Sequence, residues 1–341
     1  MRDVAALAGV SVTTVSRHMN GQIQLPEPTR RRIDKALQTL DYRPNPHARR
    51  LSTGRTETLG LVVPDIANPF FARIAAAAEA AADARGLHLS LFSTRNRPGK
   101  ERQHIESLAR NHLDGLIFAT NHAEHGDLPA LAEGAGPLVL IDEDVPGVRA
   151  PRLFCDNRAG GALAADHLVE LGHRRAAYFG AGPELMSGRR RFEGFHDEMA
   201  KHGAQIIAAY YCDYTRDGGR AAASAFIEDG KPASAVFAAA DEIAIGALEV
   251  FAAAGLRIPR DLSLIGFDDV APLHLFDPAL TAVRQPVDAL GRRAVEILTA
   301  PQGFAPRGEE LLPVSLERRA SCAAPTEPQP TTTDQQMERR V

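Results

Sequence analysis

The stretch DVAALAGVSVTTVSRHMNG, residues 3–21, predicts two short helices joined by a tight turn. The first covers residues 2–8 and ends at Gly9. The second has Ser11 as its expected N-cap and Gly21 just beyond its end. Hydroxyl N-caps and glycine stops are the usual boundaries of short helices, so the stretch predicts a helical head.

The apolar residues of the second helix gather on one side. On a helical wheel Val15 and Met19 share that side, and we expect them to pack on Val4, Leu7 and Ala8 of the first helix. Two helices packed in this way across a turn form a helix-turn-helix. The second helix of such a motif can enter the major groove of DNA.

The opposite side of the second helix is polar. Thr13 and Arg17 lie together there, with Ser16 beside them. An arginine can contact guanine with two hydrogen bonds or clamp a phosphate. The alternative is a small helical subdomain with a solvated face, and these residues alone leave the two interpretations equally open.

Charge is distributed unevenly along the 341 residues. Residues 1–55 hold ten Lys and Arg against four acidic residues, a formal +6, whereas the whole chain carries −4. The remainder therefore carries −10. A basic head on an acidic body indicates that only the head meets a polyanion.

The remaining composition excludes several classes of protein. The three cysteines, Cys155, Cys212 and Cys322, form no CxxC pair, which argues against a zinc site and a disulfide framework. The start MRDVAALAGV is too short and too broken for a signal peptide, and no run of 18 apolar residues exists. We expect a cytoplasmic protein without a membrane segment.

Four regions follow from the pattern of helices, strands and breakers. Residues 1–44 read as three helices, the third in PTRRRIDKALQTL, and 45–54 as a basic, proline-bounded segment. Residues 55–320 alternate apolar runs with amphipathic stretches, and 321–341 read as a disordered tail. The expected strands are TLGLVVP, LHLSLFS, DGLIFAT, PLVLID, PRLFCD, RRAAYFG, AQIIAAYY, SAVFAAA and LSLIGFDD. Nine strands alternating with helices predict two doubly wound parallel sheets.

Longer motifs extend this interpretation over most of the chain. DVAALAGVSVTTVSRHMNG, YRPNPHARRLSTGRTETLGLVVPDIANPFF, RRRFEGF, AADEIAIGALEVFAAAGLRIPRDLSLIGFDD and LTAVRQPVDALGRRAVEIL occur in order across residues 1–318. This arrangement closely resembles the lac-repressor family of bacterial transcription regulators. The resemblance implies a helix-turn-helix head on a two-lobed core like that of periplasmic binding proteins. It also implies a homodimer on a palindromic double-stranded operator, controlled by a small-molecule effector such as a sugar.

The resemblance implies two groups of DNA-contacting residues. In the head they lie on the second helix, and in 45–54 they belong to a hinge helix that pushes a leucine into the minor groove. The residues are Val12, Thr13, Thr14, Ser16 and Arg17 in the head, and His47, Arg49, Arg50 and Leu51 in the hinge. A plain linker is the alternative for the hinge.

The resemblance also implies an effector site between the lobes, at the carboxyl ends of strands. Carboxylates and an arginine there suit recognition of hydroxyl groups. The implied residues are Asp65, Asn68, Phe70, Asp156, Arg189, Asp241 and Asp268. For Asn68 and Asp241 helix capping is the stronger expectation, and Arg190 and Arg191 are expected to be solvated.

Rival functions find less support in the sequence. A solute-binding module for a transporter shares the two-lobed fold, but the basic head and the missing signal peptide argue against it. An enzyme on the same ligand would be a hydrolase or kinase, yet the chain has no P-loop and no GxSxG. We therefore expect neither an enzyme nor a cofactor or metal site.

The expected dimer surface uses apolar helix faces of the first lobe. Ile74 and the run Ala75–Ala78 lie on one, and DALGRRAVEIL supplies another. Larger assemblies in the family use a C-terminal leucine heptad segment, which PTEPQPTTTDQQMERRV does not offer.

Overall fold

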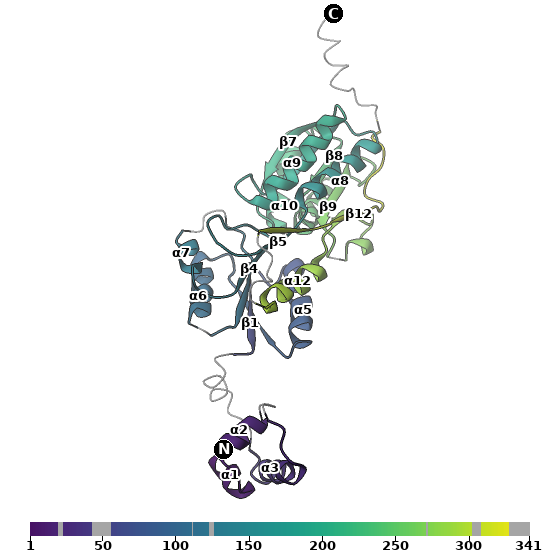
Figure 1. Cartoon of the computed structure of the whole chain (residues 1–341). Coiled ribbons are helices and arrows are strands. Elements are labelled where there is room, and N and C mark those ends of the chain that lie inside the picture. Colours follow the sequence, from purple (N-terminus) through teal and green to yellow (C-terminus); the bar gives the residue numbers. More distant parts are fainter. Residues whose placement is uncertain are drawn as a thin grey trace, which may run out of the picture. The chain divides into compact units, whose positions relative to one another are not determined.

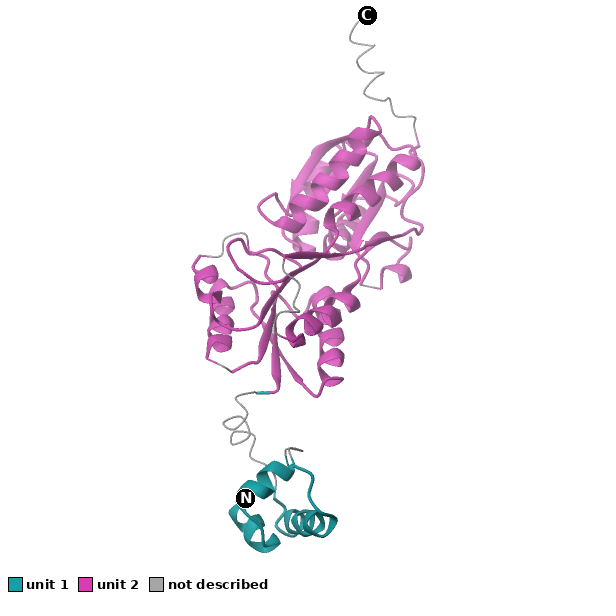
Figure 2. Ribbon diagram, in the orientation of Figure 1, with its two compact units in different colours: residues 1–56 teal, residues 57–341 magenta. Residues whose placement is uncertain are grey.

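The computed structural model consists of two compact units, residues 1–56 and 57–341 (Figure 2). The residues it describes are 1–19, 23–42, 56–110, 112–122, 126–270, 272–301 and 308–326.

The first unit is the predicted helical head. It contains α1 (Arg2–Ala8), α2 (Val12–Met19) and α3 (Glu27–Thr39). Its core consists of six buried side chains from all three helices: Val4, Ala5, Ala8, Val15, Ile33 and Ala36. The Ser11 side chain caps α2 by accepting a hydrogen bond from the Thr14 amide at 3.0 Å, as predicted.

One packing prediction for the head is wrong. Leu7 does not cover α2, because its side chain points outward and is 56% exposed. Val15 packs instead against the smaller residues of α1, Ala5 and Ala8, together with Val4. Small side chains at these positions bring the two helices close enough that the leucine is not needed between them.

The first lobe of the second unit is built on a six-stranded parallel sheet in the order β11-β5-β4-β3-β1-β2 (Figure 1). Its strands are β1 (Thr58–Val63), β2 (His88–Ser93), β3 (Gly115–Phe118), β4 (Leu138–Ile141), β5 (Arg152–Cys155) and β11 (Glu309–Leu312). Alternate strand residues pack on α5 (Pro69–Asp83) and α12 (Val287–Thr299) on one face. The others pack on α6 (Pro98–Ala109) and α7 (Leu128–Ala132).

The second lobe has a six-stranded sheet in the order β12-β10-β9-β8-β6-β7. Its strands are β6 (Arg175–Gly180), β7 (Gln205–Tyr211), β8 (Ala235–Ala238), β9 (Ser263–Asp268), β10 (Thr281–Arg284) and the antiparallel β12 (Ser315–Glu317). One face packs on α8 (Asn157–Glu170) and α9 (Met186–Lys201). The other packs on α10 (Arg216–Glu228) and α11 (Asp241–Ala253), and a short helix, η1 (Leu273–Leu275), follows β9.

The chain passes between the lobes three times. It leaves the first lobe after β5, returns between β10 and α12, and crosses again between β11 and β12. At one crossing the Asp156 amide donates to the Leu312 carbonyl at 2.9 Å, so two of the crossings lie side by side. The two lobes are therefore tied together by the chain itself, and a cleft can form beside these crossings.

All nine predicted strands are present, as β1 to β9. The packed structure extends beyond the predicted boundary at residue 320. Ser321 is fully buried and its hydroxyl donates to the Leu264 carbonyl, and the Ala323 carbonyl accepts from His173. Residues 321–326 are thus part of the second lobe, and the rest of the predicted tail lies outside the described residues.

Part of the predicted dimer surface is buried within one chain. Ile74, Ala75 and Ala78 are buried inside the first lobe, where α5 packs on α12. Gly291 of α12 lies so close to α5 that an added Cβ would meet the Ile74 carbonyl. Ile74, Ala75 and Ala78 therefore serve close helix packing within one chain, whereas Ala76 is exposed and Ala77 half-buried, and the role of this run in a dimer stays a prediction.

A second close helix contact lies between α8 and α9. An added Cβ on Gly161 would overlap the Arg191 carbonyl, and one on Gly194 would overlap the Arg158 carbonyl. Two glycines facing two backbones fix the distance and register of this helix pair. The contact also fixes the position of Arg191 on α9.

Candidate functional site

Helix α2 presents an exposed polar face on the head. Thr13 and Arg17 are exposed, Val12 is 41% exposed, and Thr14 and Ser16 are half-buried. Among the described residues nothing pairs with the Arg17 guanidinium, whereas neighbouring His18 is held by Asp34 at 3.0 Å. An unpaired cation on a short, supported helix is available to an anion or to a base edge.

The four predicted hinge residues His47, Arg49, Arg50 and Leu51 lie outside the described residues.

A cavity of about 510 Å³, here called the outer cavity, lies between the lobes at the carboxyl ends of strands. It is lined by loops and helix starts that follow β1, β2, β3, β6, β7 and β8. Its residues are Asp65, Ala67, Asn68, Phe71, Asn96, Asn121, His122, Ala181, Gly182, Glu184, Leu185, Tyr211, Cys212, Asp213, Tyr214, Thr215, Arg216 and Glu242.

A smaller space of about 20 Å³, the inner cavity, continues from it toward the crossings. The two share four residues, Asn68, Phe71, Asn121 and Tyr214. The other residues of the inner cavity are Phe70, Asp142, Arg191, Ala240, Asp268 and Gln285. Its polar groups come from both lobes, so a ligand there would touch both.

Arg191 is the arginine of the inner cavity, which corrects the expectation that it is solvated. It is 3% exposed, and its guanidinium lies 3.9 Å from the centroid of the Phe267 ring. Nε donates to Asn157 Oδ1 at 2.7 Å and Nη1 to the Ala239 carbonyl at 2.6 Å. A buried guanidinium with this many fixed contacts is rigid, and no acceptor among the described residues is bonded to its Nη2 group.

Arg189, the arginine expected at the site, lies elsewhere. It is exposed, donates to the Pro183 carbonyl at 2.9 Å, and lines neither cavity. The helical spacing could have identified Arg191 instead, because Gly188, Arg191 and Phe195 recur at intervals of three and four and form the buried side of α9.

Asp268 and Asp142 supply the carboxylates of the inner cavity. Asp268 Oδ1 accepts from Gln285 Nε2 at 2.6 Å and lies 3.9 Å from Arg191. Burial raises the pKa of Asp268 to about 6, although Arg191 opposes the change. Burial also raises the pKa of Asp142 to about 7. Asp142 was not predicted, although it ends PLVLID just as Asp268 ends SLIGFD.

Three of the other predicted effector residues line the cavities. Asn68 lines both cavities and also caps α5, accepting from the Phe70 amide at 2.9 Å, which confirms the capping prediction. Asp65 lines the outer cavity and Phe70 the inner one. These three side chains therefore gather where the site was expected.

Asp156 and Asp241 do not reach either cavity lining. Asp156 caps α8 by accepting from the Ala159 amide at 3.0 Å. Asp241 does not cap α11, because it is the first residue of that helix and accepts from the Asp269 and Val270 amides instead. Both carboxylates thus fix the backbone around the cleft.

Two contacts join the lobes beside the cavities. Glu143 of the first lobe is buried and accepts hydrogen bonds at the start of α9 from the Met186 amide (2.6 Å), the Ser187 amide (3.2 Å) and the Ser187 hydroxyl (2.7 Å). Arg190 pairs with both oxygens of Glu309 at 2.8 and 2.9 Å. A carboxylate at a helix N-terminus is favoured, so these contacts hold the observed lobe arrangement.

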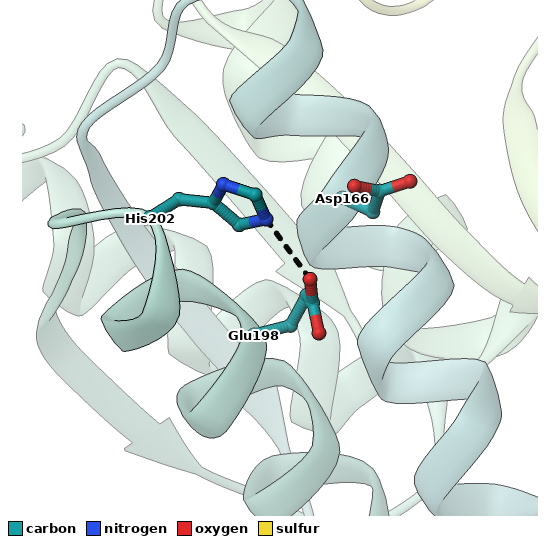
Figure 3. Close-up of side chains that lie close together, drawn as sticks. All are labelled: Asp166, Glu198 and His202. Atoms are coloured by element: carbon teal, nitrogen blue, oxygen red, sulfur yellow. Dashed lines mark hydrogen bonds and ion pairs between the residues drawn. The ribbon is translucent and has the colours of Figure 1, made fainter.

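One cluster outside the cavities has metal-ligating groups. Asp166 of α8 lies near Glu198 of α9 and His202, the residue that follows α9, with ligand atoms within 4.8 Å of one another (Figure 3). Lys201 already pairs with Glu198 at 2.9 Å, and His202 is bonded to the same oxygen at 3.0 Å. The cluster is therefore explained as a surface ion-pair network.

None of the helices in the described part of the chain is long and apolar enough to cross a membrane.

Comparison with known proteins agrees with this architecture. The profile of bacterial regulatory proteins of the lacI family matches residues 1–45, and that of a periplasmic binding protein-like domain matches 165–322. The transcriptional regulator GalR of Salmonella typhimurium is 34% identical over 331 residues, which cover 96% of this chain and 97% of GalR.

Two solved structures are similar over nearly the whole chain. The lac repressor dimer bound to operator and the anti-inducer ONPF has a TM-score of 0.83 and 28% identity, covering 94% of this chain and 98% of the repressor. A complex of the transcriptional regulator CelR with cellobiose has a TM-score of 0.70 and 31% identity over the same shares. With its helix-turn-helix head and its two-sheet core, the chain belongs to the lacI family of bacterial regulatory proteins and is a DNA-binding transcriptional regulator.

Proposed function

We propose that the protein represses transcription as a homodimer on a palindromic operator and that a small molecule bound between the lobes controls it. The observation that supports this proposal most directly is the exposed polar face of α2, where Arg17 has no partner among the described residues. The head that presents this face is a compact unit of its own, and the other unit has two lobes with a polar cavity between them. Operator binding by the similar lac repressor dimer supports the proposal.

In this proposal α2 lies in the major groove. Val12 and Thr13 lead the helix and select bases, Arg17 contacts guanine or phosphate, and Thr14 and Ser16 contact the backbone. The proposed hinge contacts are His47, Arg49, Arg50 and Leu51, with Leu51 as a minor-groove wedge. Two heads related by a two-fold axis then match two half-sites.

The proposed effector contacts are Asp65, Asn68, Phe70, Asp142, Arg191 and Asp268. Arg191 replaces Arg189 because it is the buried arginine of the inner cavity. Asp156 and Asp241 hold the surrounding loops. A ligand that touches both lobes changes the stability of one lobe arrangement relative to another, and thereby shifts the spacing of the two heads.

The cytoplasm, on the nucleoid, is the proposed location, because operator DNA is there. The rival function, delivery of a solute to a transporter, does not use the polar face of α2. In this proposal the core shares the fold of periplasmic binding proteins but not their function.

Binding-site selection on randomised DNA tests the proposal. We expect the full chain to enrich a palindromic sequence, and the Val12→Ala/Thr13→Ala double variant to enrich a different or relaxed one. Lys35→Ala, an exposed change on α3, is the control and should weaken binding without changing the preferred sequence. No enrichment by the native chain would refute the proposed function. An unchanged preference in the double variant would refute the assignment of α2.

A further inference from the structure

We propose that Glu101 and His122 form a proton switch in the wall of the outer cavity, and that this switch reverses the hydrogen-bonding character of the imidazole nitrogen that faces the cavity. With one proton shared by the pair, His122 Nδ1 is a hydrogen-bond donor toward the cavity. Without that proton, the same nitrogen is an acceptor. The consequence for an effector rests on the proposed function, whereas the switch itself operates in the chain without a ligand.

The first part of the switch is a carboxyl group that is buried without a cation. Glu101 lies in the first turn of α6 and is 1% exposed. Among the described residues its only hydrogen bond comes from the Thr120 hydroxyl, at 2.9 Å. A single neutral donor compensates poorly for the lost hydration of a carboxylate, so burial raises the pKa of Glu101 to about 7.

The second part is an imidazole with one buried, unpaired nitrogen. His122 follows β3 and lines the outer cavity, and its amide donates to Thr120 Oγ1 at 3.1 Å. Its Nε2 is buried, has no hydrogen-bond partner in the described part of the chain, and lies 3.8 Å from Glu101 Oε1. The side chain is still 23% exposed, and Nδ1 is neither buried nor bonded to a described residue. Nδ1 is therefore the nitrogen that faces the cavity.

The other charged groups near Glu101 have partners or lie farther away. They are Arg97 before α6, Lys100, Arg102 and His104 on α6, and Asp127 at the start of α7. Arg102 pairs with Asp127, and the His104 ring stacks on another ring, that of Phe92. Within the described ranges, His122 Nε2 is the only basic nitrogen that comes within 4.0 Å of the Glu101 carboxyl group. The proton of Glu101 therefore has one neighbouring acceptor.

The two protonation states of the pair present different atoms to the cavity. A ring movement of about 1 Å brings Nε2 from 3.8 Å to hydrogen-bond distance of Glu101. Neutral Glu101 then donates to Nε2, which requires the ring proton to be on Nδ1, and transfer of the donated proton to Nε2 leaves Nδ1 protonated as well. When the pair loses one proton to solvent, the Glu101 carboxylate accepts from Nε2–H and Nδ1 keeps only its lone pair.

A ligand atom opposite His122 experiences this change directly. Below about pH 7 Nδ1–H favours a carbonyl or ether oxygen there, and above it the bare nitrogen favours a hydroxyl or amide hydrogen. In the proposed function, the affinity for the effector therefore changes around neutral pH, in the direction that the ligand group beside Nδ1 determines.

Nitrogen NMR on the full chain, labelled with ¹⁵N-histidine, tests the switch without a ligand. The two tautomers are distinguishable because a ring nitrogen with a proton and one without it have well-separated chemical shifts. The signals that disappear in His122→Gln identify His122. We expect Nδ1 of the native chain to carry a proton at pH 6 and none at pH 9, with the midpoint near pH 7.

Two substitutions change the switch in different ways. In Glu101→Gln the side-chain amide donates to Nε2 at every pH, so Nδ1 should stay protonated up to pH 9. Thr120→Val removes the one hydrogen bond that favours the ionised carboxyl group, so the midpoint should move to higher pH. Glu79→Gln, an exposed carboxylate on α5, is the control and should titrate like the native chain.

Three results would overturn the inference. They are one unchanged tautomer of His122 from pH 6 to 9 in the native chain, the same titration in Glu101→Gln as in the native chain, and a midpoint that falls in Thr120→Val. If Thr120→Val does not fold, the comparison of Glu101→Gln with the native chain decides alone. Loss of operator selection by the native chain would instead refute the proposed function, because the NMR titration needs neither operator nor effector.

Discussion

Replacing Glu101 by glutamine should stabilise the protein at alkaline pH. Glu101 lies on α6, is 1% exposed, and accepts one hydrogen bond from the Thr120 hydroxyl at 2.9 Å. His122, which lines the outer cavity, is 3.8 Å away. Burial raises the pKa of Glu101 from its ordinary 4.5 to about 7, and the Thr120 hydrogen bond only partly opposes this.

The sign and size of the effect follow from this pKa. Between pH 4.5 and 7 the folded chain holds a proton on Glu101 that the unfolded chain has released, so the stability contributed by the neutral carboxyl is lost as the pH rises. Each pKa unit corresponds to about 1.4 kcal/mol, so the buried charge costs about 3 kcal/mol at pH 8. Glutamine is neutral at every pH and its Oε1 can still accept from Thr120.

Urea unfolding followed by circular dichroism at pH 5 and pH 8 measures the difference. We expect Glu101→Gln to match the native chain at pH 5 and to exceed its free energy of unfolding by up to about 3 kcal/mol at pH 8. Glu79→Gln, an exposed carboxylate on α5, is the control and should change neither value. A Glu101→Gln variant that is less stable than the native chain at pH 8 would refute the reasoning.

Four further predictions concern the head, the inner cavity, the second lobe and the assembly. Arg17→Ala should weaken operator binding by about 1–3 kcal/mol in fluorescence anisotropy without lowering the melting temperature, and a loss of folding would contradict its exposed, unpaired position. Arg191→Ala should abolish the effector-induced thermal shift and lower the free energy of unfolding by about 3–5 kcal/mol because it leaves Asp268 unbalanced, whereas Arg189→Ala should change it by less than about 0.5 kcal/mol. Equal effects of the two substitutions would refute the assignment of Arg191 to the effector site. Burial lowers the pKa of His173 to about 4, so the native chain should lose stability as the pH falls from 6.5 to 4, and His173→Gln should remove that part of the pH dependence in urea unfolding. Sedimentation should give twice the monomer mass, unchanged by deletion of residues 327–341, and a tetramer that this deletion reduces to a dimer would disprove the proposed assembly.

Local sequence patterns predicted the parts of the fold that are locally encoded. Apolar runs flanked by amphipathic stretches predicted nine strands, and seven of them are internal strands that are buried on both faces. The other two, β2 and β7, are edge strands that are only partly buried but still contain apolar runs. The three missed strands are β10 (TAVR), β11 (EELL) and β12 (SLE), and none of them has more than two apolar residues in a row. Such short segments carry no strand pattern of their own, and they become strands because they pair with a neighbouring strand.

The site was predicted less completely, for a related reason. Asp65, Asn68, Phe70 and Asp268 follow recognisable strand ends, and the structure brings them to the two cavities. The spacing of Gly188, Arg191 and Phe195 indicates which of the three consecutive arginines is buried, but the position of this buried side next to the cleft depends on the packing of α9 on α8. The packing of Ile74, Ala75 and Ala78 on α12 could not be predicted either, because it joins two helices that lie more than 200 residues apart in the sequence.

The position of strand β11 near the end of the sequence determines when the first sheet can be completed during translation. It completes the first sheet by pairing with β5, yet it lies more than 150 residues later in the sequence, at 309–312. During translation the β5 edge therefore emerges from the ribosome long before its partner, and it stays unpaired while the whole second lobe is synthesised. An open edge invites pairing with other nascent chains. The first lobe can fold to completion only when almost all of the polypeptide is available, although its first strand is among the earliest segments to appear.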